Sequence, residues 1–234
     1  MAGLDPAIQT PLPPSLDARL KAGHDGRVIP NETSYNLPPF TRGLKIGLLG
    51  GSFNPPHDGH REASLLALRR LNLHRIWWLV SPGNPLKDAR ELVPLAKRVE
   101  AARRVSQHPR IEITAIEAAI GATYTFDTIS YLKRRCPGVH FVWLMGADNF
   151  RLFDRWQRWR DIARLIPIAI IDRPGSTLTA LHGRAAQALA PYRLDETDGA
   201  RLAAAAPPAF VFLHWPRSPM SSTELRETPR PLAR

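Results

Sequence analysis

One short stretch of this chain limits most strongly what the chain can fold into. Residues 45–60 read KIGLLGGSFNPPHDGH, an apolar run that ends in two glycines and a proline-bearing loop with two histidines. The residues that follow have leucines at helical spacing, from Leu65 to Leu71. This order predicts a strand, a glycine turn and a helix start. There, close-lying backbone N–H groups and the positive end of the helix attract a phosphate.

The two histidines distinguish this stretch from other phosphate-binding loops. The sequence has neither the Gly-Lys-Ser/Thr of a Walker loop nor the G-x-G-x-x-G of a dinucleotide-binding fold. His57 and His60 instead stand where the helix is expected to begin, so both rings can face the same phosphates. An imidazole there can donate a hydrogen bond and, when protonated, adds positive charge. A helix cap beside a surface histidine is the alternative interpretation.

From residue 44 onward, apolar runs alternate with helical patterns. Strands are expected at 44–50, 75–80, 110–116, 139–145, 166–171 and 208–213, and helices at 58–72, 94–108, 124–135, 177–190 and 221–227, with two short helical pieces within 149–165. This alternation predicts a doubly wound, mostly parallel, Rossmann-like α/β sheet with helices on both faces. Ligands of such sheets bind beyond the carboxyl ends of the strands.

The chain is expected to hold one domain, preceded by an extension. Residues 1–43 contain seven of the 23 prolines and no sustained periodicity, which predicts a Pro-rich, irregular segment that lies over the domain. The domain itself is expected over residues 44–234, a length that allows a sizeable core.

Charge and composition exclude several classes of protein. The net charge of +11 lies beyond residue 43 and is scattered over several helices, which suits an enzyme that handles polyanionic nucleotides. We expect no nucleic-acid partner, because neither an RNP motif nor a clear helix-turn-helix is present. No apolar run approaches the roughly 18 residues of a membrane helix. The first residues lack a basic region followed by an apolar core, so no secretory signal is expected, and Cys136 is the single cysteine, so a cytoplasmic location is expected.

Polar residues directly follow two of the expected strands. Asn84 and Lys87 stand in the loop after the second strand, where a lysine can meet a phosphate as a point charge, although a solvated loop explains them equally. Gly146-Ala147-Asp148 ends the fourth strand, and a carboxylate there can accept both hydroxyls of a ribose. Capping of the next helix is a rival role of Asp148, and the two roles are compatible.

Aromatic residues mark two later segments. Residues 122–128 (ATYTFDT) open an expected helix, and the free N–H groups near Tyr124 and Thr125 could hold a carboxylate, with a capped helix start as the alternative. Trp156 and Trp159 stand three residues apart among arginines, and on spacing alone they form one aromatic face that packs on the core.

A second anion site is expected near the C-terminus. The stretch PMSSTELR places the hydroxyls of Ser221, Ser222 and Thr223 at a helix start, with Arg226 one turn further on. The alternative is a capping box, because Ser221 and Glu224 have its spacing.

These motifs together resemble a known family. GGSFNPPHDGH resembles the H-x-G-H signature of the nucleotidyltransferase superfamily, and in this form it is most similar to bacterial nicotinate-nucleotide adenylyltransferases. TYTFDT, GAD and PMSSTELR resemble later motifs of the same family, so the resemblance covers about residues 44–227. The chain departs from the family at Leu86, where histidine is frequent, and at Met220, where isoleucine is usual.

The resemblance implies a role for each motif residue. The implied catalytic residues, which hold the triphosphate, are His57, His60 and Arg226. The implied ATP-binding residues are Gly50, Gly51, Ser52, Phe53, Gly146, Asp148, Ser221, Ser222 and Thr223. The implied nicotinate-nucleotide-binding residues are Asn84, Lys87, Tyr124, Thr125 and Trp156, with Trp156 against the pyridine ring and Trp159 left to packing.

The resemblance also implies a reaction. The adenylyl group of ATP would pass to nicotinate mononucleotide, giving deamido-NAD and pyrophosphate in NAD biosynthesis. Mg²⁺ would come with ATP, without a dedicated metal site on the protein, and a homo-oligomer is left open. Two alternatives remain. One is a related enzyme that uses nicotinamide mononucleotide or phosphopantetheine, and the other is a non-catalytic nucleotide- or RNA-binding protein.

Overall fold

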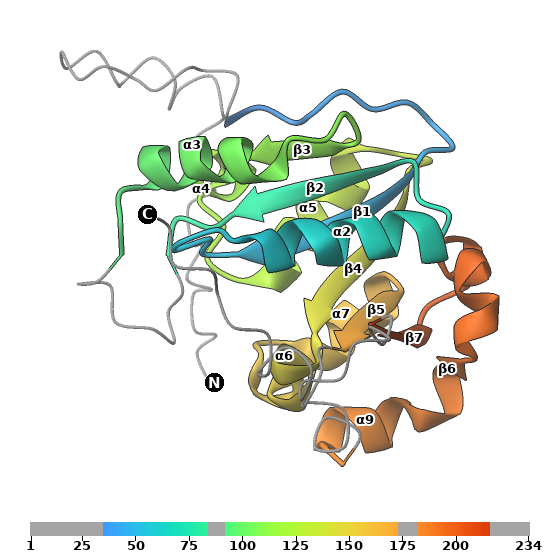
Figure 1. Cartoon of the computed structure of the whole chain (residues 1–234). Helices are drawn as coiled ribbons and strands as arrows, with labels where there is room; N and C mark the ends of the chain where they lie inside the picture. The colour runs from blue at the N-terminus through green and yellow to red at the C-terminus, as the bar shows by residue number, and fades with distance from the viewer. Residues whose placement is uncertain (1–34, 84–91, 173–181, 216–234) are drawn as a thin grey trace, which may run out of the picture.

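The computed structural model describes residues 35–83, 92–172 and 182–215, which form one parallel sheet between layers of helices (Figure 1). In these ranges the strand order is β3-β2-β1-β4-β5-β7-β6, and every neighbouring pair is parallel. The strands are β1 (Lys45–Gly51), β2 (Arg75–Val80), β3 (Ile111–Thr114), β4 (His140–Gly146), β5 (Ile168–Asp172), β6 (Arg193–Leu194) and β7 (Phe210–His214). The predicted doubly wound α/β fold is confirmed.

Two hydrophobic clusters cover the two faces of the sheet. The adjacent residues Trp77 and Trp78 belong to different clusters and are both fully buried, because successive side chains of a strand point to opposite faces. The Trp78 face is covered by α2 (Asp58–Arg70), α3 (Leu95–Ser106) and the 3₁₀ helix η5 (Glu196–Ala204). The Trp77 face is covered by α4 (Ile116–Ile120), α5 (Thr125–Arg135), α6 (Ala147–Arg151), η3 (Phe153–Arg155), α7 (Trp159–Leu165) and α9 (Arg184–Leu189).

Several element boundaries differ from the sequence-based prediction. The strand expected at 110–116 ends at Thr114, because Ile116 already begins the short helix α4. The helix expected at 177–190 is described only from residue 182, where α9 covers Arg184–Leu189 and the short 3₁₀ helix η4 (Ala190–Tyr192) follows. The edge strand β6 and helix η5 were not predicted at all.

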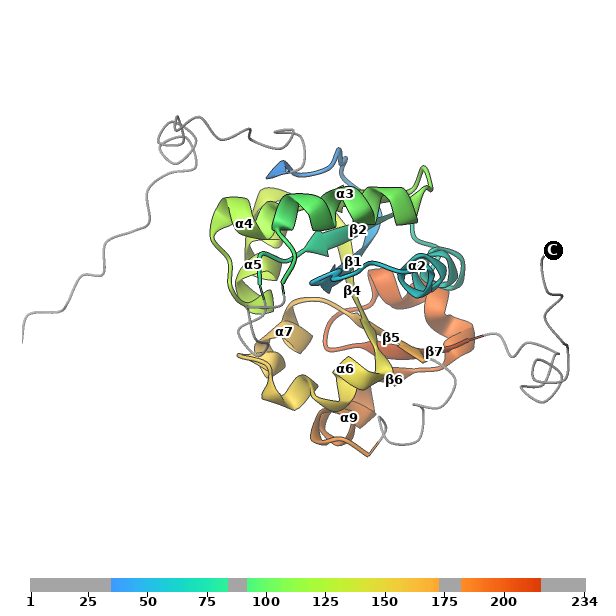
Figure 2. The same ribbon diagram turned by 60° about the vertical axis from the view of Figure 1, so that its left-hand side comes forward.

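The centre of the sheet is a topological switch point. From β1 the chain proceeds outward through β2 and β3, whereas from β4 it proceeds to the other side through β5. Figure 2 separates these halves, with β1, β2 and α2 to α5 above and β4 to β7 with α6, α7 and α9 below. Because β1 and β4 are parallel neighbours, their following loops diverge at the same edge, the usual position of a ligand in open α/β sheets.

Part of the expected N-terminal extension lies on the domain. Residues 35–43 run across the β3–β2 side of the sheet before β1 begins (Figure 1). The Thr114 hydroxyl donates to the Asn36 carbonyl at 2.8 Å, and the Phe40 ring packs edge-on against Trp77 at 6.4 Å between centroids.

Across the described ranges, none of the helices is long and apolar enough to span a lipid bilayer.

Candidate active site

The predicted site residues that the structure describes lie at the carboxyl edge of the sheet. A small cavity of about 30 Å³ there is lined by residues of β1, α2, β4 and β5: Leu49, His60, Ala63, Met145, Gly146 and Ile171. The cavity is about the size of one water molecule, so it is too small to be a nucleotide pocket and only shows which residues meet at this edge. It brings the second histidine of the first motif beside the glycine of the GAD motif, 86 positions later.

Close packing requires a glycine near the end of β1. A Cβ atom at Gly50 would lie 2.6 Å from Cη2 of Trp143, so only glycine lets this indole pack against the end of β1. Phe53 has a φ of +47°, and its buried ring stacks on Trp78 with centroids 4.9 Å apart. Any contact that Phe53 makes with ATP would therefore come from its backbone.

The two histidines lie together at the start of α2. Their ring centroids are 3.9 Å apart, with His57 exposed and His60 half-buried. The backbone N–H of His57 donates to Nδ1 of His60 at 3.3 Å, so a neutral His60 ring carries its proton on Nε2. The two imidazoles thus lie side by side, and they also form a capping box at the start of α2, which was the alternative interpretation of this motif. Their contact with a phosphate stays a prediction.

A buried hydrogen-bond chain anchors this helix start to the sheet. The indole N–H of Trp78 donates to the Ser64 hydroxyl at 2.8 Å, and that hydroxyl donates to the His60 carbonyl at 2.8 Å. The Phe53 ring also packs against the His60 ring, with centroids 4.9 Å apart. Ser64 and Trp78 thus hold the backbone of His60, a residue that lines the cavity.

Gly146 and Asp148 form a compact unit at the end of β4. A Cβ atom at Gly146 would collide with the Asp148 carboxylate, which folds back over the glycine. Gly146 is itself the N-cap of α6, and exposed Asp148 lies in the first helical turn without a side-chain capping bond. The capping interpretation of Asp148 is therefore wrong, and its carboxylate faces solvent beside the cavity-lining glycine.

The two segments implied for the nicotinate nucleotide lie near each other on the Trp77 face. Tyr124 is the N-cap of α5 and is 39% exposed, with half-buried Thr125 next to it. The Arg158 guanidinium, at the start of α7, lies 3.6 Å from the Phe126 ring centroid, so the two helix starts are in contact.

Trp156 and Trp159 have different environments. Trp156 is half-buried and packs edge-on against Trp143 and Phe153, with centroid distances of 6.2 Å and 5.4 Å. Trp159 is buried in the core, as its assignment to packing predicted. Trp156 therefore keeps accessible ring surface near the site.

Two buried charged residues near the site were missed by the sequence analysis. Glu117 of α4 accepts a hydrogen bond of 2.9 Å from the Thr128 hydroxyl in α5. Burial raises the pKa of the Glu117 carboxyl to about 7, although the Thr128 hydrogen bond lowers it. Arg98 of α3 is 2% exposed and donates to backbone carbonyls of the loops after β1 and β2. A signal existed for Arg98, which falls on the same helical face as Val99 and Ala102.

The remaining predicted site residues lie outside the described residues. They are Asn84, Lys87, Ser221, Ser222, Thr223 and Arg226. The predicted approach of Arg226 to the histidines stays a prediction.

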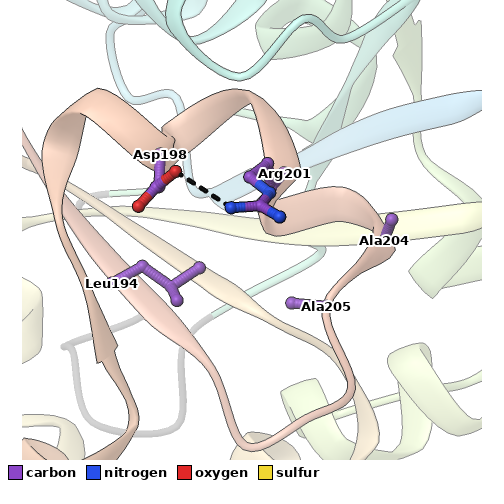
Figure 3. A pocket seen from close by; sticks show the side chains of 5 residues that line it. All are labelled: Leu194, Asp198, Arg201, Ala204 and Ala205. Carbon is purple, nitrogen blue, oxygen red and sulfur yellow. Dashed lines mark hydrogen bonds and ion pairs between the residues drawn. The ribbon is translucent and has the colours of Figure 1, made fainter.

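A larger cavity of about 290 Å³ lies elsewhere, between β6 and η5 (Figure 3). Its charged residues, half-buried Asp198 and exposed Arg201, pair with each other at 3.3 Å, and none of its lining residues is a predicted site residue.

The single cysteine does not behave as a catalytic residue. Burial raises the pKa of the Cys136 thiol to about 11, so the thiol stays protonated at neutral pH.

The fold and the site define a class of protein. A parallel sheet with a glycine turn, a helix start bearing paired imidazoles and an aspartate at the switch point is an α/β nucleotide-binding architecture. The chain matches the model of the cytidylyltransferase-like family over residues 48–228.

Similar curated proteins indicate a particular group within this class of nucleotide-binding proteins. A Brucella abortus (strain 2308) protein is 54% identical over 184 residues, 79% of this chain and 95% of the relative. A Bradyrhizobium sp. (strain ORS 278) protein is 56% identical over 183 residues, 78% of this chain and 95% of the relative. Both are named "Probable nicotinate-nucleotide adenylyltransferase". The chain therefore belongs to the cytidylyltransferase-like family, in the group of these adenylyltransferases.

The fold also matches a solved structure. A Plasmodium falciparum nicotinic acid mononucleotide adenylyltransferase complexed with NaAD aligns with a TM-score of 0.55 at 20% identity. The alignment covers 78% of this chain and 82% of that one, which supports the fold.

Proposed function

We propose that this protein is an enzyme that transfers the adenylyl group of ATP to nicotinate mononucleotide, giving deamido-NAD and pyrophosphate in NAD biosynthesis. The observation that carries the proposal is the pair of imidazoles, 3.9 Å apart, at the helix start beside Gly146. The identity to the Brucella and Bradyrhizobium relatives, over 95% of their length, supports the same activity.

The chemistry asks the protein mainly for alignment and charge neutralisation. The phosphate of nicotinate mononucleotide attacks the α-phosphorus of ATP, and pyrophosphate leaves. Since the attacking phosphate is already an anion, no strong general base and no covalent enzyme intermediate are required. The barrier is lowered by aligning two polyanions and stabilising the charge that moves onto pyrophosphate. A net charge of +11 favours the approach of both substrates.

The proposed roles follow the geometry of the edge. His60, with its proton on Nε2, donates a hydrogen bond to a phosphate oxygen of ATP. The His57 imidazole, next to it, contacts the same triphosphate. The backbone of residues 50–53 lies against the triphosphate, and the Asp148 carboxylate accepts the ribose hydroxyls. Arg226, Ser221, Ser222 and Thr223 are proposed to complete the triphosphate site.

The nicotinate mononucleotide site is proposed on the Trp77 face of the sheet, where the segments of Tyr124 and Trp156 lie near each other. The amides near Tyr124 and Thr125 hold the nicotinate carboxylate, Trp156 packs against the pyridine ring, and Asn84 and Lys87 meet the phosphate. Exposure of the α5 start and the half-buried Trp156 ring support this arrangement.

Mg²⁺ is proposed to enter as part of the ATP substrate. A hard cation prefers oxygen ligands and keeps several waters, and the triphosphate supplies such oxygens. Among the described residues, no group of three or more His, Cys, Asp or Glu side chains is arranged to hold a metal ion. We also propose a cytoplasmic location and small-molecule substrates, with no nucleic-acid partner.

The experiment that tests the activity mixes the full chain with Mg-ATP and one acceptor at a time. Pyrophosphate release with nicotinate mononucleotide, together with deamido-NAD formation, is the expected result. Faster turnover of nicotinamide mononucleotide or phosphopantetheine would assign the related enzyme instead. Binding of ATP or RNA without any pyrophosphate release would indicate a non-catalytic protein.

Replacing Trp156 with leucine is expected to raise the KM for nicotinate mononucleotide about fivefold and leave kcat within about twofold. Leucine keeps an apolar side chain on Trp143 but removes the flat ring, whose stacking is worth on the order of 1 kcal/mol. The measurement is steady-state kinetics with Mg-ATP held saturating. Trp156→Phe is the matched control and should keep most of the affinity. An unchanged KM in the leucine variant would remove Trp156 from the nicotinate site.

A further inference from the structure

A single buried arginine connects the two loops that flank the proposed site. The Arg98 side chain extends from α3 to the loops after β1 and β2 and is 2% exposed, although an arginine is almost never buried without partners. Burial lowers its pKa, yet a guanidinium remains charged at neutral pH. A buried charge of this kind requires a set of strong hydrogen-bond acceptors.

Backbone carbonyls supply these acceptors. Nη1 donates to the Ser52 carbonyl at 2.6 Å and to the Ser81 carbonyl at 2.7 Å, and Nη2 donates to the Pro82 carbonyl at 3.2 Å. Nε donates to the Val93 carbonyl at 2.7 Å, in the segment that enters α3. One planar, rigid group thus holds three separate chain segments in fixed relative positions.

The contacts of Arg98 lie directly beyond the end of the backbone pairing between β1 and β2. The hydrogen-bond ladder between β1 and β2 ends where the Ser81 N–H donates to the Gly51 carbonyl at 2.9 Å. The next carbonyls along each chain, Ser52 and Ser81, both accept from Arg98. The guanidinium therefore continues the connection between the two strands past the point where backbone pairing stops.

In the proposed function, each of these two loops contacts a different substrate. The loop after β1 follows the two glycines on the ATP side, and the loop after β2 leads to the proposed nicotinate mononucleotide side. We propose that Arg98 is a positioning residue for adenylyl transfer, which keeps the ATP-side loop in register with the loop that serves the nucleotide acceptor. The inference rests on the proposed function, and it concerns the alignment of the substrates, not their separate binding.

The test is the variant Arg98→Lys in the full chain. An ammonium is a point charge with three donors, so it cannot reproduce the planar fork that spans the two loops. We expect kcat to fall about 100-fold, since misplacement of substrates by about 1 Å costs that much, while the KM values for Mg-ATP and nicotinate mononucleotide each change less than about threefold. Circular dichroism should show the wild-type fold.

The matched control is Arg104→Lys, on the same helix, where the exposed arginine pairs with Glu100. This control should keep wild-type kinetics. Guanidinium ion at millimolar concentration should restore part of kcat to Arg98→Ala and leave Arg104→Ala unchanged.

Three outcomes would overturn the inference. One is an Arg98→Lys enzyme that turns over within about threefold of wild type. A second is a loss confined to KM, and the third is a failure of every Arg98 variant to fold, which would make the residue structural only. Absence of adenylyl transfer in the wild type would instead overturn the proposed function, and with it this role.

Discussion

Replacing His60 with alanine is expected to lower kcat by about 10²–10³, the cost of removing one preorganised donor from a site where charge develops. His60 lines the cavity beside Gly146, and its neutral ring holds its proton on the nitrogen that does not accept from His57. The bonds through Ser64 and Trp78 that hold its backbone do not involve the ring, so the helix start should keep its place although the His57 N–H loses its acceptor on the ring. Steady-state kinetics of pyrophosphate release measures the effect.

The matched control for this prediction is His140→Ala. His140 is exposed and stands at the amino end of β4, the opposite edge of the sheet, so its loss should leave kcat unchanged. Near-normal turnover in the His60 variant would refute its proposed role in holding the triphosphate. An equal loss in both variants would point to a general effect on folding.

Replacing Glu117 with glutamine is expected to remove a pH dependence of stability. Burial raises the carboxyl pKa from its ordinary value near 4.5 to about 7, so between these values the folded protein binds more protons than the unfolded chain. Stability contributed by the neutral carboxyl is therefore present at low pH and is lost as the pH rises through this window. The wild-type free energy of unfolding should fall by about 2–3 kcal/mol through this group between about pH 5 and pH 9.

The measurement is urea unfolding of both proteins across that range. The glutamine amide oxygen can still accept a hydrogen bond from the Thr128 hydroxyl. Because glutamine does not ionise, the variant should gain stability relative to wild type as the pH rises. The exposed carboxylate of Glu100 offers the control Glu100→Gln, which should follow the wild-type curve. A constant difference between Glu117→Gln and wild type would show that the carboxyl is ionised throughout.

Much of the fold could be predicted because local patterns and burial agree in a parallel sheet. Strands buried on both faces must be apolar throughout, and the runs at 75–80 and 139–145 mark β2 and β4 within a residue. The loop residues at the carboxyl ends of parallel strands share one edge, so the motifs ending β1 and β4 could be expected to meet, as His60 and Gly146 do.

The parts that were missed depend on contacts between distant segments. The edge strand β6 has two residues, too few for a periodic pattern, and exists because it pairs with β7. Glu117 lies between Ile116 and an alanine with no sign in its neighbours that Thr128 would supply a partner. Arg98 looked like one of many basic residues of a helix, and its carbonyl acceptors come from three separate segments.

The sequence by itself determined the alternating parallel architecture and the strand and helix start of the first motif, because glycines, histidines and apolar runs act through their nearest neighbours. Only the tertiary structure decided which groups share an environment: Glu117 with Thr128, the Asp148 carboxylate over Gly146, and Arg98 with the two loops. The physical reason is that desolvation and hydrogen bonding of a buried charge depend on every segment packed around it, and these segments meet only when the sheet is assembled.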